Sequence, residues 1–151
     1  MIKSINAQVS FYHSLGVSFF LSPEYGVPAL TYSPRINLLE IGKIGTLSAG
    51  THLSIGITSN AFIVDGLFAA EINIGNGSKE DVEQDFGFFF GGGVGGNWIT
   101  DYDEPSPMRG PIVNAGFVFQ DCRIRFSLLK NIKKYSYEDD GILSAGILFG
   151  L

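Results

Sequence analysis

Hydrophobic and polar residues alternate along most of this chain, and clusters of Gly, Pro, Asn and Asp interrupt the alternation. A period of two is typical of β-strands, whose successive side chains point to opposite faces. The segment 45–58 shows the pattern most clearly, with Leu53 and Ile55 on one face and Ser48 and Ser54 on the other. The pattern predicts a strand with one oily face and one small, polar face.

The same alternation recurs often enough to predict eight strands. We expect them at about residues 4–20, 27–41, 45–58, 62–74, 86–100, 112–119, 122–128 and 142–151. Pro28 and Pro34 weaken the second segment as an interior strand, because proline cannot donate a ladder hydrogen bond. Polar loops are expected at 75–85, 100–110 and 130–141. An even number of strands suits a small bacterial barrel.

The distribution of charge predicts which strand face lies outside. Charged residues make up only 17% of the chain, and the segments at 45–58, 86–100 and 142–151 contain none. A soluble barrel would carry Lys, Asp and Glu on its outer face, since an uncharged exterior invites aggregation. We therefore predict an all-β, eight-stranded, antiparallel up-and-down transmembrane β-barrel whose apolar faces meet lipid. Aromatic residues near the segment ends are expected to form a girdle: Phe19, Tyr32, Phe62, Phe86, Trp98, Phe119 and Phe149.

The polar faces carry a few charges of both signs, and these predict an ionic cluster inside the barrel. Its members are Arg35, Asp65, Glu71, Arg123 and Arg125. An eight-stranded barrel is just wide enough for side chains to fill it. Buried charges are acceptable there only when they are paired and hydrogen-bonded. The sequence therefore predicts a closed polar lumen without an open pore.

Two other functions compete with a structural or accessory membrane barrel. His52 and Ser54 form an H-x-S pair on one strand face, similar to that of membrane-embedded lipid deacylases, and Glu71 is the nearest acid on the next predicted strand. A serine nucleophile needs such a base and an orienting acid. The first alternative is thus a lipid hydrolase using His52 and Ser54. The second is a soluble, lipocalin-like barrel that binds an apolar ligand.

Composition excludes several classes of partner and cofactor. The net charge of −5 argues against nucleic acid, whose phosphates need a basic patch. Cys122 is the only cysteine, so no intrachain disulfide and no multi-cysteine metal site can form. The glycine run 91–96 lacks the lysine of a phosphate-binding loop and is better explained by strand curvature. The acidic clusters match no calcium loop, so we predict no metal and no cofactor.

Three segments carry a family resemblance: FGFFFGGGVGGNW (86–98), AAEINIGNGSKED (69–81) and GILSAGILFGL (141–151). They resemble the small, porin-like outer-membrane β-barrel proteins of Bacteroidetes-type bacteria, and SINAQ (4–8) resembles the end of an export signal. The resemblance implies an integral outer-membrane address, contact with membrane lipid and a structural or accessory role, with loops available to a protein partner. Residues 1–151 are expected to form one domain, in which 1–7 is a signal-peptide remnant or a disordered start.

Overall fold

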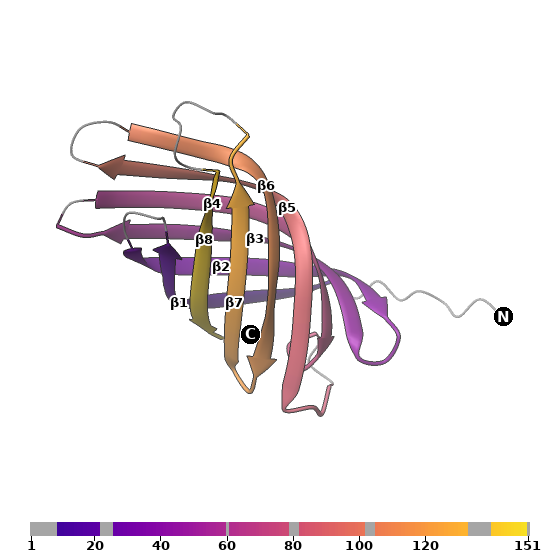
Figure 1. The fold of residues 1–151 in the computed structure, drawn as a ribbon. Coiled ribbons are helices and arrows are strands. Elements are labelled where there is room, and N and C mark those ends of the chain that lie inside the picture. The colour runs from indigo at the N-terminus through magenta and orange to yellow at the C-terminus, as the bar shows by residue number, and fades with distance from the viewer. Residues whose placement is uncertain are drawn as a thin grey trace.

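A computed structural model describes residues 9–21, 26–59, 61–78, 82–101, 105–132 and 140–150. Eight antiparallel strands form a closed barrel in which each strand pairs with its neighbours in the chain and β8 pairs with β1 (Figure 1). The strands are β1 (Ser10–Leu21), β2 (Gly26–Ile41), β3 (Gly45–Ile57), β4 (Ala61–Gly75), β5 (Phe86–Asp101), β6 (Pro105–Phe119), β7 (Cys122–Lys130) and β8 (Gly141–Phe149). This confirms the predicted fold. None of the described residues form a helix long and apolar enough to cross a membrane.

The barrel has two ends, which we name by their relation to the chain termini. The terminal end is where β1 begins and β8 ends, and the distal end is where β1 ends and β2 begins. The stretch 1–8, parts of the expected loops at 75–85, 100–110 and 130–141, and Leu151 lie outside the described residues. The single-domain assignment of 1–151 therefore stays a prediction.

The start of β6 differs from the sequence expectation. A polar loop is predicted over 100–110, whereas the strand already begins at Pro105, opposite Thr100 of β5. Pairing with β7 on the other side begins only at Ile112, opposite Leu129. The first part of β6 therefore has a full ladder on one side only.

That one-sided ladder explains how three prolines fit into β6. Pro105, Pro107 and Pro111 share the orientation of Arg109, whose N–H points away from β5 and donates to Asn131 Oδ1 at 3.4 Å. Proline is tolerated where its missing N–H would face an unpaired edge. Prolines are typical of loops, and the sequence alone does not show that this part of β6 lacks a partner strand on one side.

The two prolines of β2 lie where no β2–β3 pair is formed, and Pro28 precedes the first of these pairs, Ala29↔Gly56. Pro34 pairs with His13 of β1, but the β2–β3 pairing passes from Tyr32↔Leu53 to Arg35↔Gly50 without including it. The ladder is thus interrupted at the proline, and β2 continues on both sides of it. The strand expected over 27–41 is therefore confirmed, and it is an interior strand despite its two prolines.

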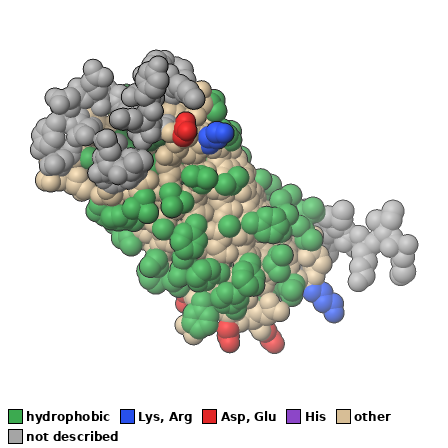
Figure 2. Space-filling view, viewed as in Figure 1, with side chains coloured by type: hydrophobic (Ala, Val, Ile, Leu, Met, Phe, Trp, Pro, Cys, Tyr) green, Lys and Arg blue, Asp and Glu red, His purple; other side chains and the backbone are tan. Residues whose placement is uncertain are grey.

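The apolar strand faces point outward, as predicted. Phe68 and Phe88 are 57% and 56% exposed, whereas polar residues of the opposite faces, such as Ser48 and Asn73, are buried. Hydrophobic side chains cover the visible wall, and charged ones appear only near its two ends (Figure 2). A soluble lipocalin-like barrel would need the reverse arrangement, because its ligand requires an apolar interior. The structure therefore contradicts that alternative.

Glycines of β5 allow the wall to pack tightly around the interior. A Cβ atom at Gly93 would lie 1.9 Å from the Phe68 carbonyl oxygen, and one at Gly91 would lie 2.9 Å from Cγ of Glu71. No side chain fits at either position without displacing backbone or Glu71. This crowding supports the interpretation of the glycine run as a structural feature of a narrow barrel.

Candidate functional site: the barrel interior

All five residues predicted to form an ionic cluster lie inside the barrel. Each is at most 5% exposed. They come from three strands: Arg35 from β2, Asp65 and Glu71 from β4, and Arg123 and Arg125 from β7. Alternation places each side chain inward, and closure of the barrel brings β7 across from β2 and β4.

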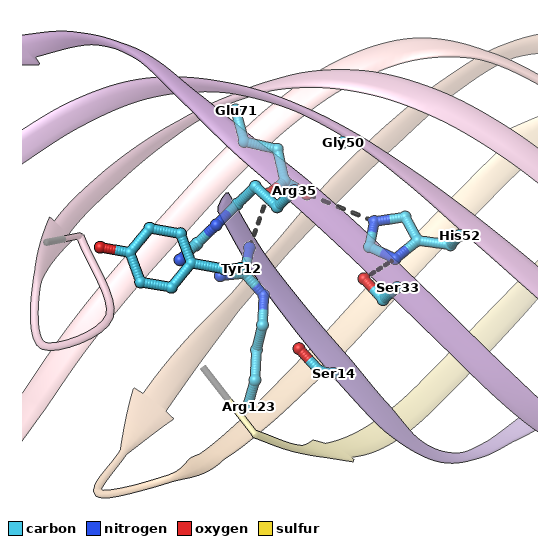
Figure 3. A pocket seen from close by; sticks show the side chains of 8 residues that line it. All are labelled: Tyr12, Ser14, Ser33, Arg35, Gly50, His52, Glu71 and Arg123. Carbon is cyan, nitrogen blue, oxygen red and sulfur yellow. Dashed lines mark hydrogen bonds and ion pairs between the residues drawn. The ribbon is translucent and has the colours of Figure 1, made fainter. Parts of the chain in front are cut away.

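Glu71 is the centre of the interior network (Figure 3). Its Oε2 accepts a hydrogen bond from Arg123 Nη2 at 2.6 Å, and its Oε1 accepts one from Asn114 Nδ2 at 2.5 Å. His52 Nε2 lies 3.5 Å from the same Oε1. Both carboxylate oxygens therefore have donors, which is the condition under which a buried charge is tolerated.

Asn73 connects the two arginines on the terminal side of Glu71. Its Oδ1 accepts hydrogen bonds from Arg35 Nη1 at 2.7 Å and from Arg123 Nη1 at 3.1 Å. Its amide nitrogen donates to Ser48 Oγ at 2.8 Å. Asn73 was not among the residues predicted for the cluster. Its position two residues after Glu71 was the available signal, because both side chains must then share one face.

Aromatic rings inside the barrel pack against the guanidinium groups. The Arg123 guanidinium carbon lies 3.5 Å from the centroid of Phe89, and that of Arg35 lies 4.8 Å from the centroid of Tyr12. Phe89 is the residue that breaks the polar face of β5 in the sequence. Its inward ring is explained by this cation–π contact, which is worth more when the cation is desolvated.

Asp65 and Arg125 do not join the network around Glu71 by hydrogen bonds. Asp65 Oδ1 accepts a hydrogen bond from Asn97 Nδ2 at 3.2 Å. Within the described part of the chain, Arg125 makes no ion pair within 4 Å. The structure therefore brings Arg35, Glu71 and Arg123 together and places the other two predicted residues elsewhere in the interior.

His52 and Ser54 are both buried but are not bonded to each other. His52 Nδ1 lies 2.6 Å from Ser33 Oγ, and Ser54 Oγ lies 2.9 Å from Thr31 Oγ1. Ser54 thus lacks the adjacent base that a nucleophile needs. Ser33, His52 and Glu71 instead form a series of contacts, in which His52 lies between the Ser33 hydroxyl and the Glu71 carboxylate (Figure 3).

The space beside this series is too small for a lipid. The cavity bounded by Ser33, His52 and Glu71 has a volume of about 10 Å³, roughly what one water molecule requires. All three side chains are buried. Their contacts cross-link β2, β3 and β4 and leave no room for an acyl chain. Among the described residues, no group of three or more His, Cys, Asp or Glu side chains is arranged to hold a metal ion.

Different contacts occupy the two ends of the interior. At the terminal end, Arg35 Nη2 donates to the Gly77 carbonyl at 2.6 Å, and Asn37 Nδ2 donates to the Ser78 carbonyl at 2.6 Å. Toward the distal end, the inward side chains become apolar. This buried cluster, named the distal cluster, consists of Phe20, Val27, Ala29, Ala61, Ile63, Ile99, Met108, Leu129 and Ile142.

Comparison with known proteins identifies the fold. No protein-family model and no curated protein matches the chain. The structure of Ail, the attachment invasion locus protein of Yersinia pestis, matches with 12% identity and a TM-score of 0.52 over 95% of this chain and 97% of that chain. Ail in complex with the heparin analogue sucrose octasulfate matches at 13% identity and a TM-score of 0.52, again over 95% and 97% of the two chains. Neisserial surface protein A matches with 12% identity and a TM-score of 0.53 over 93% of this chain and 97% of that chain. The chain therefore has the closed, eight-stranded antiparallel barrel fold of Ail and Neisserial surface protein A.

Proposed function

We propose that this protein is an integral outer-membrane β-barrel with a structural or accessory role, which presents its loops to a partner and neither conducts solutes nor catalyses a reaction. The proposal rests on the distribution of side chains, which is the reverse of that in a soluble barrel: apolar side chains lie outside and polar ones inside. Water would disfavour such an exterior, because large exposed apolar surfaces lead to association. Lipid favours it.

Strand length and backbone pairing support insertion into a membrane. The strands contain 9 to 16 residues, and a tilted transmembrane strand needs about 9 to 11. A closed barrel also pairs its backbone groups between strands, as a hydrocarbon environment requires. The matched barrels Ail and Neisserial surface protein A are outer-membrane proteins, which supports the same address here. The likeness to Bacteroidetes-type barrels stays a prediction, since it rests on composition and strand rhythm.

Detergent dependence tests the membrane address. We expect the purified chain to stay monodisperse only in detergent, and to migrate differently on a gel before and after boiling. The reason is that a closed, hydrogen-bonded barrel resists unfolding by detergent until it is heated. Size-exclusion chromatography and unboiled gel samples measure both properties. A monodisperse chain in plain buffer, with no change on boiling, would contradict the proposal.

Three sets of contacts support a closed lumen. The network around Glu71 crosses the middle of the interior, and the distal cluster fills it toward one end. At the other end, the carbonyls of Gly77 and Ser78 are bound by Arg35 and Asn37 from inside. Removing these contacts would leave charged groups buried without partners, so the closed arrangement is favoured.

Conductance measurement tests the closed lumen. We expect no stepwise current when the protein is inserted into a planar lipid bilayer, because an eight-stranded interior is filled by its own side chains. A porin added to the same bilayer serves as the positive control. Insertion is confirmed separately by the gel shift of recovered protein. Regular steps of uniform size from the wild-type chain would show that the lumen conducts.

The burial of the reactive side chains supports an accessory role over catalysis. Ser33, His52 and Glu71 are all engaged with one another inside the barrel. The described charged side chains on the outside gather at the two ends, where loops meet water. A protein partner would therefore find its polar contacts at these ends.

A further inference from the structure

Two cationic side chains lie on the outer wall toward the distal end. Arg109 of β6 and Lys130 of β7 are exposed. Both point outward, because the preceding residues Met108 and Leu129 are buried in the distal cluster. On β5, the outward positions from Phe86 to Trp98 are apolar or glycine. The outward positions beside them on β6 and β7 are also apolar, except for Arg109 and Lys130. An anion bound beside two cations in such an apolar wall would stabilise them, so an anionic partner is expected.

The register places the two cations close enough to share one ligand. The β6–β7 pairing sets Ile112 opposite Leu129, and Ile132 N donates to the Arg109 carbonyl at 3.1 Å. Arg109 therefore faces Ile132, and Lys130 is its diagonal neighbour on the same outer face. Diagonal neighbours of this kind are about 7 to 8 Å apart. Two long side chains at that separation can reach the same phosphate group.

Neither cation is neutralised by a carboxylate that the structure describes. Within the described residues, Arg109 and Lys130 form no ion pair within 4 Å. Asp140 is an exposed carboxylate at the same end, and it pairs with neither of them. With respect to these residues, both side chains can bind an anion from outside the chain.

The wall beside Arg109 has residues typical of a membrane interface. Arg109 pairs with Gly96 of β5, which has no side chain. Trp98, two residues along, is 54% exposed on the same face. Trp is enriched at the membrane interface, and a long cationic side chain can keep its stem in apolar surroundings while its head reaches water.

We propose that Arg109 and Lys130 bind the phosphate of an anionic lipid, whose acyl chains lie along the apolar outer wall beside Gly96. This proposal rests on the membrane address proposed above. The cations supply charge-assisted hydrogen bonds to the phosphate, with the planar guanidinium suited to two oxygens. The barrel would thereby hold one lipid at a defined place on its distal rim.

Lipid retention by the full chain in detergent micelles tests this site. The probes are bis-phosphorylated lipid A and the same lipid A without phosphate, and native mass spectrometry counts the bound lipid. We expect the wild type to prefer the phosphorylated form. Each of Arg109→Gln and Lys130→Gln should weaken that binding about fivefold, and the double variant about thirtyfold. Lys43→Gln, at the terminal end, is the matched control and should bind like the wild type.

Several results would overturn the proposal. They are equal binding of both lipids by the wild type, undiminished binding by the double variant, an equal loss in Lys43→Gln, or displacement of the lipid by excess inorganic phosphate. The gel shift on boiling, measured on every variant, separates this site from the membrane address. A normal shift without preference for phosphate defeats only the lipid site, whereas a wild type without any shift defeats both proposals.

Discussion

Replacing Glu71 with alanine is expected to lower the free energy of unfolding by about 3 to 5 kcal/mol, the usual cost of removing one partner of a buried ion pair. Glu71 accepts hydrogen bonds from Arg123 and Asn114 and lies beside His52. Its loss leaves the Arg123 guanidinium buried without a carboxylate. Urea unfolding in micelles, followed by the fluorescence of the single tryptophan, Trp98, measures the change.

Two further variants make this result specific to the network. Glu83→Ala removes an exposed carboxylate at the terminal end, and we expect its effect to stay within about 0.5 kcal/mol. Glu71→Ala combined with Arg123→Met should recover part of the loss, because the stranded cation is also removed. A Glu71→Ala barrel as stable as the Glu83→Ala barrel would show that the interior network contributes little to stability.

Replacing Phe68 with arginine is expected to cost about 2 to 4 kcal/mol, the penalty for a cation on the lipid face near the bilayer midplane. Phe68 lies at the middle of β4, opposite Thr51 and Val94, and its ring points outward. The cost arises because the guanidinium must leave water or deform the bilayer. Unfolding by urea from lipid vesicles measures it.

The same substitution nearer the distal end provides the control. Phe62 also faces outward on β4, but it is the second residue of the strand. Phe62→Arg should therefore cost only about 0 to 1 kcal/mol, because its side chain can reach the interface. If both variants were as stable as the wild type, the wall would face water, and the membrane address would be wrong.

The positions of the cluster residues could be predicted from the sequence, whereas their partners could not. Alternation places Arg35, Glu71 and Arg123 on polar faces, and a closed barrel turns those faces inward. Glu71 and Arg123 meet from strands that are not adjacent, so their contact depends on how the barrel closes. Nothing local in the chain encodes which cation reaches which carboxylate.

The pairing of His52 shows the same limit at shorter range. The H-x-S spacing suggested Ser54, because residues two apart on a strand share a face. In the structure, His52 is hydrogen-bonded to the hydroxyl of Ser33, and Ser54 is hydrogen-bonded to Thr31 instead. Both partners lie on β2, and the register between β2 and β3 decides which hydroxyl stands beside which side chain.

The sequence by itself determined the strands, their two faces and the direction in which the apolar faces point. These follow from a local period of two and from the absence of charge on the outer faces, neither of which requires knowledge of distant residues. The tertiary structure decided the extent of β6, the split of the predicted ionic cluster and the diagonal placement of Arg109 and Lys130 on the outer wall. Each of these depends on which strand lies alongside and in which register, because hydrogen bonds and ion pairs form only between groups that closure of the barrel brings within a few ångströms.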